Sequence, residues 1–442
     1  MKKITALLIA VMMLLIAFTG CTNKEPVTPP TATENPVPTS PDETPPEDSI
    51  SGNIVYWSMW NETEPQAEVI NAAIADFVAA HPNATVTVEW KGRDVRTLVF
   101  PALDAGTQVD LFDSDPSYFY TSDPSKLLEI SDFYNSKSLD SDEPMTQSII
   151  GGLVTWDAAM ARDTDLSGQN YTIPYAPYIV SFVYNKDLFA QAGIISAPTT
   201  WDELDDACAK LKAIDADPIT AEANAYYDML LSYYLVRAVG PEKCVALSDG
   251  KDGWDDPMVL QAFKAYEDFA SKGYFSPSLE TNQFPQGQDD LSLGKVGMYF
   301  NGSWLPAEQA AVAPEDFSWG QFAFPTVPNG VTGINDNTVG GQAFAVSANT
   351  DNAAAVIEFL RYVFSYNVQS IFPTFNAIPA IISVDWPPAL TDSKAILQNL
   401  NSNINWAGGL GGDFINGVVN PEFMKVLLGQ ETAEQAITNI MK

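Results

Sequence analysis

The chain has 442 residues, 46% of them hydrophobic, and ten tryptophans, which favours a folded protein over a disordered one. Its formal net charge of -34 argues against nucleic acid and anionic membrane surfaces as partners, because both require clustered lysine and arginine side chains. Its single histidine, His81, excludes histidine-dependent catalytic triads and metal sites built from several histidines.

The N-terminal residues are typical of a secretory signal. Lys2 and Lys3 precede an uncharged run over residues 4–20 that ends in small residues before Cys21. This pattern resembles a bacterial lipobox and predicts a signal peptide over residues 1–20, with lipidation of Cys21. Two acyl chains on that cysteine would anchor the protein to the cell membrane on its extracytoplasmic side. An uncleaved spanning helix is the alternative, at the short end of the length range for such helices.

The next segment, residues 21–51, is predicted to be a disordered tether. Residues 22–50 contain eight prolines, six threonines and six acidic residues against one lysine, with no apolar periodicity. Such a composition buries too little surface to offset the chain entropy of folding, so spacing is its expected role, with merely tolerated sequence as the alternative. The remaining stretch of about 390 residues is too long for one hydrophobic core and fits two domains.

The first part of this stretch is predicted to alternate strands and helices. Residues 53–57 form a short strand, and Thr63 and Gln66 form a capping box for a helix with one apolar face. Residues 85–90 and 109–113 form two further strands. A strand, a helix and a strand at this spacing imply a parallel pair with a right-handed crossover.

The most informative part of the chain begins at a second strand-rich region. Residues 171–183 are rich in aromatic and β-branched residues and predict a strand, whose two prolines indicate a sheet edge or a crossing between lobes. After a short helix, Thr200 and Glu203 form a capping box for a longer one. Cys208 lies on the apolar stripe of that helix, so it and Cys244 are either two buried thiols or a disulfide.

The later elements complete an α/β pattern. Residues 296–300 and 342–347 predict strands, and residues 351–364 predict a long helix. The sequence has no clear internal repeat. We therefore expect two lobes, each with a mostly parallel sheet flanked by helices, and a chain that crosses between them more than once.

Residues 171–204 resemble the lobe-crossing region of bacterial extracellular solute-binding proteins of carbohydrate ABC importers, the family that includes maltose-binding protein. The matching order is a strand that ends in Tyr-Asn-Lys-Asp, then Ala-Gly, a proline, Thr-Trp and an acidic residue followed by leucine. The resemblance implies a two-lobe, periplasmic-binding-protein-like architecture with a ligand cleft between the lobes. It divides the chain into a first lobe of residues 52–176 plus 329–376 and a second lobe of residues 177–328 plus 377–442.

The predicted ligand site lies where the strands end, because ligands of open α/β sheets lie outside the carboxyl ends of the strands and, between two lobes, in the cleft. The loops there pair aromatic rings with amides or carboxylates, the combination that a sugar needs for its C–H faces and its hydroxyl groups. The resemblance implies sugar contacts from the loop after the first strand, the crossing strand and a Gly-Ser-Trp motif. The candidate ligand-binding residues are Trp57, Trp60, Asn61, Glu62, Asp113, Asp115, Tyr178, Asn301, Trp304, Gly341 and Trp406.

Structural roles compete with this interpretation. A tryptophan in a strand-rich protein is more often a core residue, and that is the interpretation preferred for Trp90 and Trp201. Asp113 and Asp115 fit solvated loop acids equally well. The run over residues 163–168 begins like a calcium loop but is followed by a proline where the bidentate glutamate is required, so a solvated turn is expected.

The sequence thus predicts a lipid-anchored binding protein, not an enzyme, that captures a sugar or oligosaccharide by hinge closure and delivers it to the permease subunits of an ABC transporter. Neither a cofactor nor a metal is expected. Two alternatives remain open: a secreted polysaccharide-degrading enzyme with two carboxylates, and a binding protein or sensor for a peptide or another small solute.

Overall fold

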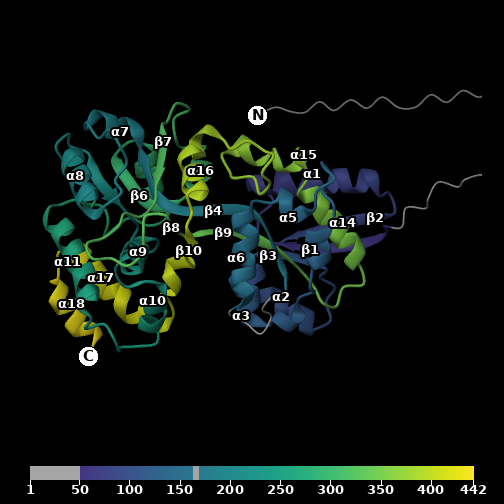
Figure 1. Ribbon diagram of the computed structural model, residues 1–442, viewed down its shortest axis with the longest axis horizontal. Helices are drawn as coiled ribbons and strands as arrows, with labels where there is room; N and C mark the ends of the chain where they lie inside the picture. Colours follow the sequence, from purple (N-terminus) through teal and green to yellow (C-terminus); the bar gives the residue numbers. More distant parts are fainter. Residues whose placement is uncertain (1–49, 163–168) are drawn as a thin grey trace, which may run out of the picture. The chain divides into compact units, whose positions relative to one another are not determined.

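The computed structural model describes residues 50–162 and 169–442 (Figure 1). The predicted signal peptide, the predicted lipidation site Cys21, most of the predicted tether and the run from Asp163 to Gly168 lie outside these residues. Within them, no helix combines the length and the apolar character that crossing a bilayer requires.

The described residues contain one eight-stranded sheet and one short strand pair. The strands are β1 (Gly52–Ser58), β2 (Ala84–Trp90), β3 (Leu111–Ser114), β4 (Thr172–Asn185), β5 (Asp217–Thr220), β6 (Val296–Gly302), β7 (Trp319–Phe322), β8 (Asp336–Asn337), β9 (Val339–Val346) and β10 (Ser402–Asn403). The large sheet has the order β2-β1-β3-β9-β4-β6-β5, with β7 also paired to β4, and β8 pairs with β10.

The strand directions make this sheet a mixed one. Its pairs are parallel at β1–β2, β1–β3 and β5–β6, and antiparallel wherever β4 or β9 takes part. The parallel pair predicted on either side of the first helix is therefore present, and the α/β fold class is confirmed. Figure 1 shows β4 and β9 running from one group of helices to the other.

The β1, β2, β3 part of the sheet is covered by helices from two separate stretches of the chain. The α-helices are α1 (Pro65–Ala80), α2 (Val95–Asp104), α3 (Pro116–Ser122), α4 (Ser131–Asn135), α5 (Met145–Ser148), α6 (Gly151–Arg162), α14 (Ala353–Val363) and α15 (Tyr366–Gln369). Short 3-10 turns are η1 (Gly92–Asp94), η2 (Pro124–Lys126) and η3 (Phe372–Phe375). α1 packs on α14, with the rings of Phe77 and Phe359 5.6 Å apart.

The start of α1 differs from the prediction. The capping box expected from Thr63 and Gln66 is absent from the described structure, because the helix begins at Pro65 and Glu64 occupies the N-cap position. Proline suits the first helical position, since the amide hydrogen that it lacks would have no partner inside the helix. The Glu64 carboxylate instead binds Arg93 and the backbone amide of Asn61.

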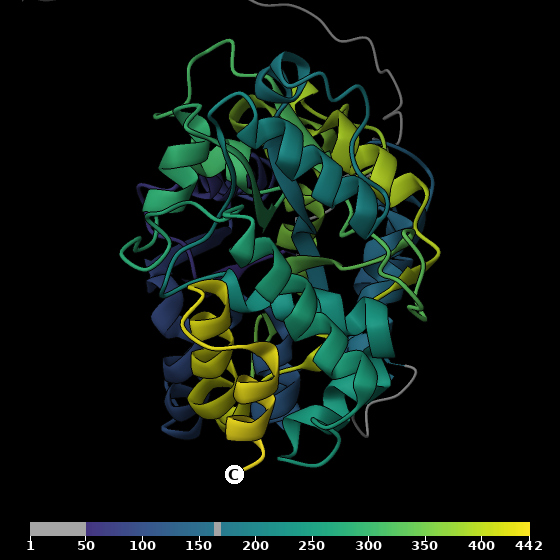
Figure 2. The same ribbon diagram turned by 90° about the vertical axis from the view of Figure 1, so that its left-hand side faces the viewer.

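The β5, β6 part of the sheet carries the remaining helices. They are α7 (Lys186–Gln191), α8 (Trp201–Lys212), α9 (Tyr227–Val239), α10 (Pro241–Ser248), α11 (Pro257–Ser271), α12 (Gln286–Ser292), α13 (Leu305–Glu308), α16 (Thr391–Gln398), α17 (Asn420–Leu427) and α18 (Ala433–Ile440), with 3-10 turns η4 (Pro388–Leu390) and η5 (Trp406–Gly409) and one π-helical turn, η6 (Ile415–Val419). Figure 2 shows α17 and α18 in yellow at the C-terminal end, where both pack against α11.

The predictions for α8 are confirmed. Thr200 and Glu203 form the capping box, with the Thr200 hydroxyl accepting from the Glu203 amide at 3.3 Å. Trp201 is buried and its ring stacks on Phe269 at 4.6 Å, which is the structural role expected of it. Of the two alternatives for the cysteines, the structure has the free thiols: Cys208 and Cys244 are both buried and unbonded to each other.

Two separate hydrophobic cores lie on the two halves of the sheet. The first core extends from Ile54 to Ile179 and takes in β9, α14 and the stretch from Ile378 to Leu390. The second extends from Tyr178 to Val327 and resumes at Ile404. The chain thus passes between the cores within β4, at β9 and again near residue 400. The predicted division of the chain into two lobes that move relative to each other stays a prediction.

A buried arginine in the second core fixes the segment that leads back to β9. Arg237 in α9 is 1% exposed, and its guanidinium donates to the carbonyl oxygens of Phe324 at 3.0 Å, Gly333 at 2.6 Å and Asp336 at 2.5 Å. Burial lowers the pKa of this guanidinium to about 10, so it is charged at neutral pH. These bonds hold the end of the loop that enters β9, the strand by which the chain returns to the first core.

We expect Arg237→Met to lower the free energy of unfolding by about 3 kcal/mol, because one buried and two partly buried carbonyl groups lose a charged donor. Urea denaturation of the variant measures this loss. Lys264→Met is the control, since the Lys264–Glu434 ion pair is exposed and screened by solvent, so its loss should cost much less stability than that of Arg237. Equal effects of the two substitutions would contradict the anchoring role of Arg237.

Candidate functional site

A cavity of about 530 Å³ lies between the two cores. The first wall of the cavity lies on the side of the first core and contains Trp60, Arg93 and Asp115. The second wall lies opposite, on the side of the second core, and contains Trp304. Residues 176–178 of β4 lie along the cavity where the strand passes from one core to the other. The crossing strand therefore places side chains from both halves of the protein around one space.

Aromatic rings dominate the second wall. The indole rings of Trp304 and Trp406 are nearly parallel, 6.0 Å apart with 27° between their planes, and Tyr226 lies 6.3 Å from Trp304 at 32°. The Tyr178 ring stands edge-on to both indoles, 5.7 Å from Trp304 and 6.0 Å from Trp406. This arrangement offers flat apolar faces on which the C–H groups of a ligand can pack.

Two glycines make room for these rings. A β-carbon on Gly302 would lie 2.2 Å from Cζ3 of the Trp304 indole, and one on Gly340 would lie 2.6 Å from the hydroxyl oxygen of Tyr178. Both distances are far below van der Waals contact, so any larger residue would displace the ring. The glycine of the Gly-Ser-Trp motif is thus needed for the position of the tryptophan that follows it.

The first wall is held by directional bonds. The Trp60 indole Nε1 donates to the Tyr175 hydroxyl, and the Arg93 guanidinium lies 4.7 Å from the centre of the Trp60 ring. Arg93 also donates to the carbonyl oxygen of Met59 at 2.7 Å and pairs with Glu64 at 2.8 Å. Trp60 is therefore fixed at its edge by one residue and at one face by another.

A second arginine, Arg96, and an aspartate, Asp115, also line the cavity. The Arg96 guanidinium lies 4.6 Å from the centre of the Tyr118 ring, and its Nε donates to the Ser114 hydroxyl at 3.2 Å. Among the described residues it makes no ion pair. Asp115 caps α3 by accepting from the Ser117 amide at 2.9 Å. The cavity lining thus contains both hydrogen-bond donors and acceptors.

Several polar atoms of the cavity have no hydrogen-bond partner in the described structure. They include the buried Nε1 of Trp304, a donor, and the buried Oε1 of Gln342, an acceptor. Glu308 lines the cavity and is exposed, and desolvation by the surrounding protein raises the pKa of its carboxyl group. A ligand with both hydroxyl donors and acceptors would satisfy such groups. Within the described residues, no cluster of three or more His, Cys, Asp or Glu side chains could hold a metal ion.

The structure brings part of the predicted site together. The candidates that line the cavity are Trp60, Asp115, Tyr178, Trp304 and Trp406. Trp406 comes from η5, close to the C-terminus, and is 43% exposed. These residues come from five separate stretches of the chain, so only the fold makes them neighbours.

The other candidates lie outside the cavity. Trp57 is buried in the first core with the Lys91 ammonium 4.1 Å from its ring centre, and Asn61 is exposed with its amide bound to Glu64. Asn301 is fully buried in β6, with both atoms of its side-chain amide unpartnered. Gly341 faces the β4 backbone at Pro177, within the sheet.

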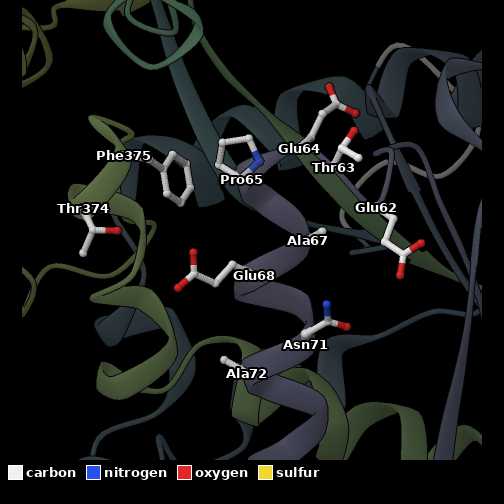
Figure 3. Close-up of a pocket in the computed structure, with 10 residues that line it drawn as sticks. All are labelled: Glu62, Thr63, Glu64, Pro65, Ala67, Glu68, Asn71, Ala72, Thr374 and Phe375. Atoms are coloured by element: carbon white, nitrogen blue, oxygen red, sulfur yellow. The ribbon is translucent and has the colours of Figure 1, made fainter. Parts of the chain in front are cut away.

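Two acidic candidates also lie elsewhere. Asp113 is fully buried beneath the Trp60 loop, where its carboxylate accepts from the Met59 amide at 2.9 Å and from the Tyr175 hydroxyl. Glu62 lines a different hollow, an open groove of about 730 Å³ between α1 and η3. Figure 3 shows Thr374 and Phe375 across this groove from α1, with the Glu68 side chain reaching toward them.

The cavity, not this groove, is the better candidate site. The groove is lined only by residues of the loop before α1, of α1 and of η3, all on the side of the first core. Phe375 is its one aromatic residue, and three glutamates line it as well. The cavity has rings and hydrogen-bonding groups from both cores. A ligand bound there contacts both halves of the molecule at once.

Several cavity residues were not predicted from the sequence. They are Arg93, Arg96, Tyr226, Glu308 and Gln342. The arginines could have been found, because they follow the end of β2 and the rule of strand carboxyl ends applies to that strand too. Tyr226 follows β5, a four-residue strand without a distinct pattern, so no sequence signal pointed to it.

Comparison with known proteins identifies the family. The family described as bacterial extracellular solute-binding protein matches residues 60–369. The chain belongs to this family. The resemblance seen in the sequence is thereby confirmed at family level, and the family assignment places this solute-binding protein outside the cytoplasm.

Curated relatives of this solute-binding protein match it over part of their length. A Brucella abortus protein, provisionally named as a binding protein, is 31% identical over 202 residues, or 44% of this chain and 47% of the relative. The diacetylchitobiose binding protein DasA of Streptomyces coelicolor is 26% identical over 260 residues, or 56% and 55%. The chain thus spans about half the length of the curated relatives that it matches.

Solved structures show the same fold. A chitin oligosaccharide binding protein superposes with a TM-score of 0.67 at 22% identity, covering 88% of this chain and 97% of the other. A probable secreted solute-binding lipoprotein from Streptomyces coelicolor gives a TM-score of 0.69 at 16% identity, covering 89% and 98%. The two-lobe architecture predicted for this solute-binding protein is confirmed.

We expect Gly302→Ala to displace the Trp304 ring and to lower the free energy of unfolding by about 1–3 kcal/mol, because the added methyl group overlaps the indole. Urea denaturation and the tryptophan emission maximum report the two effects. Gly417→Ala is the matched control, since no atom lies within 4 Å of its added β-carbon. Unchanged emission in Gly302→Ala would contradict the tight fit of Trp304 on Gly302.

Proposed function

We propose that this solute-binding protein captures a sugar or oligosaccharide in the cavity between its two cores. The observation that carries the proposal is the set of aromatic rings on the second wall, with Trp60 facing the cavity from the first. Sugar rings pack C–H patches on such faces, while their hydroxyl groups pair with carboxylates, amides and guanidinium groups at the edge. Asp115, Arg96 and Gln342 supply those edge groups.

The names of relatives support this choice of ligand. DasA is a diacetylchitobiose binding protein, and a neighbour of the same fold is a chitin oligosaccharide binding protein. Another neighbour of the same fold was solved in complex with acarbose. The charges of the cavity fit a neutral ligand as well, because two arginines are matched by Asp115 and Glu308.

Capture is proposed to proceed by hinge closure. A ligand can drive closure only through contacts that are better in the closed state, so residues from both cores have to contribute. The strands β4 and β9 are the connections about which the halves would move. The closed form would then be recognised by the permease subunits of an ABC transporter.

Membrane attachment is part of the same proposal. Lipidation of Cys21 would hold the protein at the outer side of the cell membrane, and residues 22–50 would let it reach the permease. Acid hydrolysis of the purified protein followed by fatty-acid analysis tests for the lipid anchor.

A thermal-shift screen of the full chain against mono- and oligosaccharides, amino acids and peptides tests the choice of ligand. A ligand that binds only the folded state raises the melting temperature by mass action. We expect a rise with one class of sugar and recovery of that sugar unchanged. A rise only with peptides or amino acids would overturn the sugar assignment, and new reducing ends would indicate an enzyme instead.

We expect Trp304→Ala to weaken sugar binding by more than about tenfold with the fold intact, because the ligand loses its central apolar surface. Isothermal titration calorimetry measures the affinity, and circular dichroism checks the fold. Trp386→Ala is the control, since this half-buried tryptophan packs against the first core outside the cavity. Affinity retained in Trp304→Ala would rule out its role as a platform.

A further inference from the structure

A chain of buried hydrogen bonds links Asp113 to the cavity. Asp113 Oδ2 accepts from the Tyr175 hydroxyl, and the same hydroxyl oxygen accepts from the Trp60 indole Nε1. Asp113 Oδ1 accepts from the Met59 amide at 2.9 Å. Met59 and Trp60 both line the cavity, whereas Asp113 and Tyr175 are fully buried beneath them. The carboxylate thus holds both ends of the short segment that carries the first wall.

The chemistry of the groups fixes the direction of donation along this series of hydrogen bonds. An indole nitrogen can only donate, so the Tyr175 oxygen has to accept from Trp60 and its hydrogen has to point to Asp113. The Tyr175 ring is itself held in place by Phe344, on which it stacks at 4.0 Å. An ionised carboxylate at position 113 completes this order, because both of its oxygens accept.

We propose that Asp113 is a positioning residue that orients Trp60 for ligand through Tyr175 and Met59. This inference rests on the proposed capture of sugar in the cavity. Arg93 completes the support from the other side of the ring, where it also bonds the Met59 carbonyl oxygen. Trp60 is therefore preorganised, and a ligand does not have to spend binding free energy on ordering it.

Protonation of Asp113 would disturb the chain. It places a hydrogen on one of the two oxygens to which the Met59 amide and the Tyr175 hydroxyl donate, and it removes the charge that strengthens both bonds. Burial raises the pKa of Asp113 from 3.8 to about 6. Between pH 3.8 and about 6, Asp113 is therefore protonated in the folded state and ionised in the unfolded chain. The contribution of Asp113 to the free energy of unfolding falls as pH rises through this range. Affinity for sugar should change in the opposite sense, rising as Asp113 ionises.

The other titratable groups around Asp113 do not share this behaviour. Tyr56 from β1 and Tyr175 from β4 face it, and burial raises the pKa of both phenols, so they stay neutral. Phe344 from β9, the pairing partner of Asp113 in the sheet, is apolar and does not titrate. Arg96 from α2 binds the neighbouring Ser114 hydroxyl, and Arg93 reaches the chain only over the Trp60 ring.

The test compares substitutions of two buried aspartates, Asp113 and Asp157, on the side of the first core and uses the full chain. Asp113→Asn adds a donor permanently, as protonation does, and Tyr175→Phe removes the link to Trp60 while keeping the ring. Asp157→Asn is the matched control: Asp157 is also fully buried, accepts from Thr172 and Tyr120, and has its pKa raised by burial to about 7, but it does not contact the cavity lining. Fluorine NMR of protein labelled with fluorotryptophan follows Trp60, whose resonance is assigned with Trp60→Phe.

We expect the Trp60 resonance to shift or broaden in Asp113→Asn and Tyr175→Phe but not in Asp157→Asn. Sugar affinity in the wild type should fall about tenfold between about pH 7.5 and about pH 5, and this dependence should be lost in Asp113→Asn. An unchanged Trp60 resonance in Tyr175→Phe overturns the proposal even if Asp113→Asn does not fold. If no sugar binds the wild type, the proposed function fails, while the resonance still decides whether Asp113 positions Trp60.

Discussion

The arrangement of this protein depends on the backbone pairing of one strand, β4. Its first residues, Thr172 to Ile179, pair with β9, and its last residues, from Val180 onward, pair with β6 and β7. Tyr178 lies at the cavity where the pairing changes over, and its neighbours Ile179 and Val180 belong to different cores. A slip of one residue would turn every one of these side chains to the opposite face. The position of the site is therefore a consequence of the register of the crossing strand.

The two walls of the cavity are held by different kinds of force. The rings of the second wall are placed by close packing, with Gly302 and Gly340 leaving the necessary space. Packing of this kind depends little on pH or salt. The first wall is placed by hydrogen bonds and charges, from Asp113 below Trp60 and Arg93 over its face. The rings of the second wall are therefore held without charged groups and Trp60 of the first wall is held with them, although a bound ligand would need both walls.

Local signals in the sequence were enough for much of the fold. The Thr200 capping box is formed within four residues, and the β1–α1–β2 unit has the spacing of a parallel pair, so neither needs distant contacts. The antiparallel entry of β9, and with it the return of the chain to the first core, depends on contacts far apart in the chain, and no local pattern reports it. The expected Thr63 cap failed because a proline two residues later starts the helix just as well.

The same limit applies to the site. The sequence places Trp60 and Trp304 at strand ends and so predicts their neighbourhood, but it does not tell which way a side chain at a strand end points. Asp113 was a candidate for ligand contact, with a solvated loop acid as the equal alternative, and the structure has it buried beneath Met59 and Trp60, outside the cavity lining. A crystal structure with the sugar that most raises the melting temperature is the most direct measurement. We predict a sugar ring on Trp304 with Trp60 in contact from the other core; a sugar bound by one core alone, or in the α1 groove, would contradict this account.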